Sequence, residues 1–222
     1  YSKKDIAKTY NIPESKIDVV FNGAKDKFHP AKKQDIDDLT KGLEYFFYIG
    51  SLHPRKNIIN LLKGFETFKS QSNNNSKLVL GGDFLFRSEE IKRIISSLKC
   101  NEDIILAGRL SDKDLNTWLS GAIALTYVPH FEGFGIPLLE AMKCETPVLT
   151  SNVTSLPEVG GNAAIYVNPE STDEIAQGMK ELFENSTLRN ELVQNGKERL
   201  KSYSWNLSAE LLWNSIQKTI NS

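Results

Sequence analysis

The chain has 222 residues, 40% of them hydrophobic and 25% charged, a balance typical of a globular protein with one sizeable core. Lysine and arginine number 27 against 28 aspartates and glutamates, so the net charge of -1 provides no global field to attract nucleic acid or an anionic membrane. No apolar run approaches a membrane span, and the two cysteines lack metal-ligand spacing, so we expect a cytoplasmic protein without a disulfide framework.

The start of the chain precedes the main pattern and divides into two parts. Residues 1–25 open with a charged helical pattern, turn at "NIPESK" and continue as an expected strand, "IDVVFNG", over 17–23. Residues 26–44 are rich in charge and are interpreted as a linker. Because the sequence begins without methionine inside a helical pattern, we expect a fragment of a longer protein.

From residue 45 the chain alternates between two periodicities. Six apolar runs are typical of strands buried on both faces: "EYFFYIG", "KLVLGG", "DIILAG", "AIALTYV", "PVLTS" and "AAIYV". Amphipathic helical patterns lie between these runs, over residues 56–69 and after Ser88, Ser111 and Ser171. Strand and helix in strict turn predict an α/β domain over residues 45–204, with a Rossmann-like, doubly wound parallel sheet.

Residues 205–222 have the pattern of a further amphipathic helix. Trp205 and Trp213 lie within it and are available for burial. We therefore expect this helix to pack towards a domain that the sequence does not contain.

The topology indicates where a ligand binds. If the first and fourth strands are neighbours, the binding crevice lies beyond their carboxyl ends. The loop after the first strand, "GSLHPRKN", supplies Arg55 and Lys56, and the loop after the fourth, "PHFEGFGIPLLEAM", supplies glycines, a helix start and two carboxylates. Cations and the amide groups of a helix N-terminus together suit the diphosphate of a sugar nucleotide.

Each residue of the second loop has a role in this hypothesis. Gly133 and Gly135 permit close backbone approach to phosphate, and Pro137 fits the first helical turn, where its missing N–H is not needed. Glu140, about one turn into the helix, can accept both hydroxyls of a ribose. Glu132, which precedes the helix, would then face the transferred sugar.

The segment "FEGFGIPLLEAMKCETPVLTSNVTSLPEVGGNAAIYVNP" resembles the signature of the family 4 retaining glycosyltransferases, also called group 1, which have the GT-B fold. Its two glutamates are spaced as in that family's Glu-x7-Glu motif, and "YIGSLHPRKNIINLLKGFETF" and "IILAGRLSDKDLNTWLSGA" resemble other blocks of the family in the same order. The resemblance spans about residues 17–205. It implies the C-terminal, donor-binding half of a two-domain enzyme, with residues 1–25 as a remnant of the N-terminal acceptor domain.

The resemblance also implies roles by position. Lys56 matches the family's diphosphate-binding lysine, Glu140 its ribose-binding glutamate, and Glu132 the glutamate near the sugar and the reacting centre. Four residues match the loop whose amides contact sugar and phosphate: Gly133, Phe134, Gly135 and Ile136.

Two parts of the site match the family less closely than these residues do. Many members carry arginine directly after the glycine of the first strand, where this chain has Ser51, and Arg55 is expected to substitute for it. Contacts to the base are expected from the loop around Arg109 and Leu110, largely through the backbone.

The implied reaction transfers a hexose from a nucleoside diphosphate to an acceptor hydroxyl, with retention, in the synthesis of bacterial surface polysaccharide or glycoconjugate. Lys56, Arg55 and the helix N-terminus would stabilise the departing diphosphate, so neither a cofactor nor a metal is expected, and Asp35 and Asp37 are interpreted as solvated charge. The donor is expected to be GDP- or UDP-linked, and "GSLHPRKN" favours GDP-mannose. The carbohydrate or lipid-linked acceptor would bind the other domain, with the full enzyme at the cytoplasmic face of a membrane and this fragment inactive alone.

Other functions of the same fold remain open: a sugar-nucleotide epimerase, a phosphorylase, or a non-catalytic nucleotide-binding module. An oxidoreductase is disfavoured because "GSLHPRKN" lacks the Gly-x-Gly-x-x-Gly pattern. His53 and His130 are assigned no catalytic role, and Glu158 is left as either a helix cap or a residue bordering the donor site.

Overall fold

The computed structural model describes residues 1–72, 74–83 and 88–221. Its centre is a sheet of six parallel strands in the order β3-β2-β1-β4-β5-β6. The strands are β1 (Tyr45–Ile49), β2 (Lys77–Gly81), β3 (Ile104–Gly108), β4 (Ala124–Tyr127), β5 (Val148–Ser151) and β6 (Ile165–Val167). The order reverses between β1 and β4, which pair directly, so the predicted doubly wound sheet is confirmed.

The strands are apolar along their length because helices cover both faces of the sheet. Side chains of β1 point alternately to the two faces, yet every residue from Tyr45 to Tyr48 is fully buried. At the outer edge, β3 is less covered, and Leu106 remains 41% exposed.

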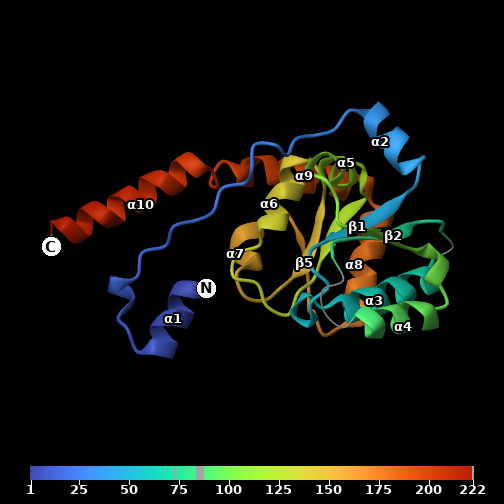
Figure 1. Cartoon of the computed structure of the whole chain (residues 1–222), viewed down its shortest axis with the longest axis horizontal. Helices are drawn as coiled ribbons and strands as arrows, with labels where there is room; N and C mark the ends of the chain where they lie inside the picture. The colour runs from blue at the N-terminus through green and yellow to red at the C-terminus, as the bar shows by residue number, and fades with distance from the viewer. Residues whose placement is uncertain (73, 84–87, 222) are drawn as a thin grey trace.

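Helices form a layer on each face, and Figure 1 shows α3 and α4 below the sheet and α5 and α9 above it. On the first face, α3 packs against α4 and α8. These helices are α3 (Ile58–Gln71), α4 (Ser88–Ser97) and α8 (Thr172–Glu184). On the other face, α9 packs against α6, and α2 packs against α5. That layer contains α2 (Lys33–Thr40), α5 (Asp112–Gly121), α6 (Ile136–Lys143), α7 (Leu156–Gly160) and α9 (Ser186–Leu200). The described residues also form three single turns of 3-10 helix: η1 (Glu14–Lys16), η2 (Pro54–Lys56) and η3 (Asn101–Asp103).

The prediction of a strand over residues 17–23 is wrong. This segment is extended but lies outside the sheet, where no neighbouring strand is available to pair with it. It follows α1 (Ser2–Tyr10) and runs along α10 (Trp205–Ile220) instead. Asp18 accepts a hydrogen bond of 2.9 Å from Ser215, and Ser208 donates to the carbonyl of Phe21.

The stretch interpreted as a linker contains a helix, α2, and covers part of α5. Phe28 is buried, the amide of His29 donates to Asn116 at 2.9 Å, and the amide of Ala31 donates to Ser120 at 3.0 Å. A few apolar and backbone anchors therefore fix a segment whose composition is dominated by charge.

The predicted C-terminal helix is present as α10 and projects away from the sheet (Figure 1). Among the described residues, the exposed large hydrophobic side chains lie in residues 1–20 or 205–220, apart from Leu106 and Phe131. Packing of these surfaces against a further domain stays a prediction. No helix in the described ranges has both the length and the apolar character needed to cross a bilayer.

Candidate functional site

Three strands end in glycine at the carboxyl edge of the sheet. Gly50, Gly82 and Gly108 follow or close β1, β2 and β3 with φ of 147°, 135° and 64°. A Cβ atom on Gly82 would lie 1.9 Å from the carbonyl oxygen of Gly50, so the two backbones approach closely only because no side chain is present. The edge is therefore bare backbone, over which the loops after β1 and β4 meet.

Backbone and amide hydrogen bonds join these two loops. The amide of His130 donates to the carbonyl of Arg55 at 3.0 Å. Asn57 adopts a left-handed conformation, with φ of 59°, and its buried side chain donates to the carbonyls of Val128 at 2.9 Å and Pro169 at 2.7 Å. Asn57 thus ties three loops together, a role that the sequence pattern did not indicate.

The joined loops bring the three predicted catalytic residues into contact. Lys56 Nζ lies 2.5 Å from Glu132 Oε2, and Arg55 reaches the same oxygen at 3.4 Å. Tyr127, at the end of β4, donates its hydroxyl to this oxygen at 2.6 Å. Lys56 also donates to the Tyr127 hydroxyl and lies over the Tyr127 ring, 4.8 Å from its centre. This cluster of Arg55, Lys56, Tyr127 and Glu132, here the cation–carboxylate cluster, includes a tyrosine that no sequence motif singled out.

The cation–carboxylate cluster favours the charged form of Glu132. Burial raises the pKa of Glu132, but hydrogen bonds from Lys56 and Tyr127 outweigh burial, and the pKa lies below its usual value. Burial lowers the pKa of Lys56, and Glu132 opposes that shift. Two cations surround one carboxylate, so the cluster keeps a net positive charge that can attract an anion.

The loop that carries Glu132 is fixed by side chains from the β5–α7 connection. Ser155 donates to the carbonyls of Glu132 at 2.9 Å and Phe134 at 3.0 Å, and Thr154 accepts from the amide of Glu132 at 3.3 Å. At Gly133, a Cβ atom would meet nothing within 4 Å. The backbone at Gly133 is therefore open to a ligand.

Helix α6 starts directly after this loop, as predicted. Gly135 is the N-cap residue, with φ of 109°, and a Cβ atom there would lie 2.8 Å from Leu156. Within the part of the chain that the structure describes, no side chain caps the helix; Pro137 in its first turn has no N–H, and the amide of Leu138 donates to the carbonyl of Gly135 at 3.0 Å. The amide of Ile136, the first residue of α6, is thus left for another acceptor.

Glu140 lies one turn into α6 and is 8% exposed. Within the described residues, no hydrogen bond or ion pair reaches its carboxylate. Burial raises its pKa, and the nearby charges of Lys25 and Lys27 oppose the shift. Lys143, three residues further along α6, binds Asp26 at 2.9 Å and not Glu140.

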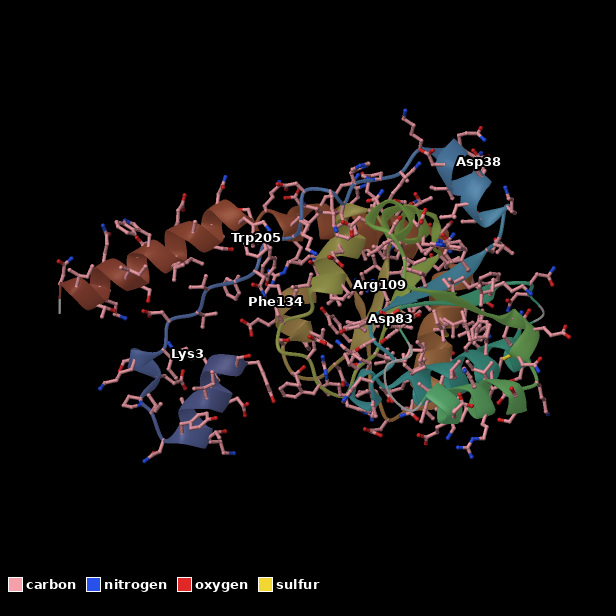
Figure 2. The ribbon with its side chains drawn as sticks, viewed as in Figure 1. Lys3, Asp38, Asp83, Arg109, Phe134 and Trp205 are labelled. Carbon is pink, nitrogen blue, oxygen red and sulfur yellow. The ribbon has the colours of Figure 1, made fainter. Side chains whose placement is uncertain are left out.

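The residues expected to contact the base lie on the loop after β3. Arg109 is exposed, and Leu110 packs against the core. Figure 2 shows Arg109 near the middle of the molecule and Phe134 on the side that faces α1. In the described part of the chain, no hydrogen bond or ion pair joins Arg109 to the cation–carboxylate cluster. Ser51 contributes its carbonyl, which accepts the Tyr48 hydroxyl at 3.0 Å.

Two cavities flank the loop after β4. One, of about 430 Å³, is lined by His53, Arg55 and His130 among others, and His130 Nδ1 lies 2.8 Å from Glu170 Oε1. The other, of about 260 Å³, lies between Gly133, Phe134 and the first residues of the chain. Glu158 also lines the second cavity, so it lies beside the loop that carries Glu132.

The described residues contain no group of three or more histidine, cysteine, aspartate or glutamate side chains placed to hold a metal ion. Cys100 and Cys144 are free and buried. Asp35 and Asp37 lie exposed on α2.

The sequence of this chain is similar to those of known glycosyltransferases. The model of the family "Glycosyl transferases group 1" matches residues 31–199. The chain is 28% identical over 210 residues to an O-antigen chain mannosyltransferase B of Escherichia coli, covering 92% of this chain and 55% of that protein. The chain thus spans about half the length of this relative.

Two solved structures share the fold. The C-terminal domain of a group 1 glycosyl transferase from Francisella tularensis (LpcC) superposes with a TM-score of 0.69 at 22% identity, over 81% of this chain and 97% of that one. Anabaena HepE in complex with UDP-glucose superposes with a TM-score of 0.78 at 17% identity, over 92% of this chain and 57% of that one.

Proposed function

Since the chain belongs to the group 1 glycosyltransferases, with a GT-B type fold, we propose that it binds a nucleoside-diphosphate sugar at the carboxyl edge of its sheet. The longer protein would transfer the hexose to an acceptor hydroxyl with its anomeric configuration retained. The observation that carries this proposal is Glu140, a buried carboxylate without a partner in the described structure, on the helix whose N-terminus is uncapped.

Such a carboxylate is costly to ionise while it is buried, and a ligand that donates hydrogen bonds to it offsets that cost. Two adjacent hydroxyls of a ribose are a suitable ligand, because each can donate to one carboxylate oxygen. Because Glu140 is largely buried, it would accept these hydroxyls in a site that already excludes much of the water. Arg109 and Leu110 would contact the base from the loop after β3.

The diphosphate would lie between the cation–carboxylate cluster and α6. Lys56 and Arg55 would supply the charge, and the amide of Ile136 at the start of α6 would supply a backbone donor. Gly133, Phe134, Gly135 and Ile136 would present their backbone to phosphate and sugar. These groups would stabilise the leaving diphosphate during transfer without a metal ion.

The sugar would lie beside Glu132, in the loop after β4. The Escherichia coli relative is named as a mannosyltransferase, which favours mannose as the hexose and GDP as the carrier. HepE, in contrast, holds UDP-glucose, so GDP and UDP are the two nucleotides to compare. The name of the O-antigen relative favours surface polysaccharide synthesis as the process, and we place the full enzyme at the cytoplasmic face of a membrane.

The test is calorimetric titration of the 222-residue chain with GDP, UDP, ADP and NAD. We expect one nucleoside diphosphate to bind, and Lys56→Ala and Glu140→Ala each to weaken it by about 1.5–3 kcal/mol, the usual worth of a charge-assisted hydrogen bond. Lys63→Ala and Glu181→Ala, at exposed helix positions, are matched controls and should bind as the wild type does. Binding of NAD alone, or equal losses in the controls, would refute the proposal.

A further inference from the structure

The contacts to the Glu132 carboxylate converge on one of its two oxygens. Lys56, Arg55 and Tyr127 all contact Oε2, at 2.5, 3.4 and 2.6 Å. Within the described residues, no hydrogen bond or ion pair reaches Oε1. The carboxylate is thus held at one oxygen and leaves the other available to a ligand.

The three donors differ in how well a ligand can reach them. The Arg55 side chain is 47% exposed and that of Lys56 is 9% exposed, whereas Tyr127 is fully buried. A diphosphate can therefore approach Arg55 directly and Lys56 at its small exposed part, whereas the Tyr127 hydroxyl lies out of its reach.

We propose that Tyr127 is a positioning residue that holds Glu132 in place as a carboxylate when a nucleoside diphosphate draws Lys56 and Arg55 towards itself. The proposal rests on the proposed function, since it assigns Tyr127 a part in the same donor site. Glu132 would then keep Oε1 directed to the sugar throughout binding.

The fold holds Tyr127 firmly enough for this role. It is the last residue of β4, its carbonyl accepts the Thr150 hydroxyl at 2.7 Å, and its ring stacks on Tyr48 with 6.1 Å between centres. Its hydroxyl also accepts a hydrogen bond from Lys56, so it touches both partners of the ion pair. A small shift of Lys56 does not require Tyr127 to move.

The Tyr127 hydroxyl should affect whether Glu132 is protonated when a diphosphate binds. The titratable and charged groups that face Glu132 are Lys56 and Arg55 from the loop after β1, Tyr127 from β4 and Tyr48 from β1. When a diphosphate shares both cations, the carboxylate lies near an anion, which favours its protonated form. Tyr127 opposes this by donating to the charged form. Without the hydroxyl, Glu132 should take up a proton from solvent as the diphosphate binds.

The test compares Tyr127→Phe with Tyr45→Phe in the full chain. Tyr45 is an equally buried tyrosine at the start of β1, away from the carboxyl edge of the sheet. Its hydroxyl donates to the Trp118 carbonyl at 2.7 Å. In ¹³C spectra of carboxyl-labelled glutamate, with the Glu132 signal assigned by its loss in Glu132→Gln, we expect an upward shift of the Glu132 pKa in Tyr127→Phe only. An unchanged Glu132 pKa in Tyr127→Phe, with thermal unfolding like that of the wild type, overturns the proposal.

A second measurement uses GDP or UDP, whichever binds. Calorimetry near pH 6 in two buffers of different ionisation enthalpy should show net proton uptake on binding to Tyr127→Phe, with less uptake for wild type and Tyr45→Phe. Equal uptake by all three proteins refutes the role of Tyr127. If the wild type binds no diphosphate, the proposed function fails, while the titration of the free chain still decides whether Tyr127 holds Glu132.

Discussion

At the scale of single residues, Glu140 shows how a binding site can conflict with stability. Burial raises its pKa, and the nearby charges of Lys25 and Lys27 compensate only in part for the buried charge. A group with a raised pKa in the folded state favours folding below its usual value, here 4.5, and loses that contribution as the pH rises through the folded-state pKa. The ionised carboxylate therefore destabilises the free protein at neutral pH.

We expect Glu140→Gln to stabilise the free chain by about 1 kcal/mol at pH 7, as substitutions that relieve a strained site commonly do. The gain should shrink below pH 4.5, where the wild-type carboxyl is protonated in both states. Urea unfolding of both proteins at pH 7 and pH 4 measures this difference. Glu181→Gln, at an exposed position of α8, is the control; a loss of stability in Glu140→Gln at pH 7 would contradict the prediction.

The sequence predicted which charged residues would meet, but only part of what holds them. Arg55, Lys56 and Glu132 could be placed together because each follows a strand that ends at the topological reversal. Tyr127 could not be placed with them, because a tyrosine within an apolar run has the pattern of an ordinary core residue. Only the structure shows that Lys56 donates a hydrogen bond to it. Asn57 acts through a left-handed backbone conformation that the residue pattern does not specify.

At the scale of elements, local signals predicted helix starts well. The pattern after Ser171 predicts a helix, and the Ser171 hydroxyl accepts a hydrogen bond from the amide of Glu174 at the start of α8. The predicted strand over 17–23 failed because a strand needs a neighbour, and only the fold shows that none is adjacent. Helix α9 was not predicted; its weakly amphipathic sequence buries Leu192 and Gly196.

The Ser171 side chain caps the start of α8. Ser171→Ala should destabilise the fold by about 1 kcal/mol, because the first turn of α8 loses its side-chain acceptor. Since α8 packs along α3, the loss should appear as a lower midpoint of the single thermal transition. Ser202→Ala, in the exposed turn after α9, is the matched control and should unfold like the wild type. An unchanged midpoint for Ser171→Ala would show that this cap contributes nothing measurable.

At the scale of the whole molecule, exposed apolar side chains gather at the two ends of the chain. Leu212 and Trp213 on α10 are 52% and 58% exposed, and Val19 and Val20 lie on the segment that runs beside α10. Clustered apolar surface of this kind usually marks an interface. The sequence suggested a partner for α10 from its two tryptophans, and the fold adds the N-terminal segment to the same region.

We expect the isolated chain to self-associate through this region. Leu212→Gln with Trp213→Gln should lower concentration-dependent association in sedimentation velocity and leave the circular dichroism spectrum unchanged, because neither side chain belongs to the core. Leu106→Gln, at an exposed hydrophobic position on the outer edge strand, is the control. Association that falls equally in the control, or persists in the α10 variant, would contradict the expectation.

The open space at Gly133 has a consequence for how this protein can change over generations. Of the 14 glycines, all within the described residues, Gly133 is the position that combines an ordinary φ with no atom within 4 Å of where a Cβ would lie. Folding therefore tolerates a side chain there, whereas Gly82 and Gly135 would clash with backbone or core. Selection for a different sugar could act on residue 133 without first destroying the scaffold, which makes it the natural starting position for a library that aims to alter donor choice.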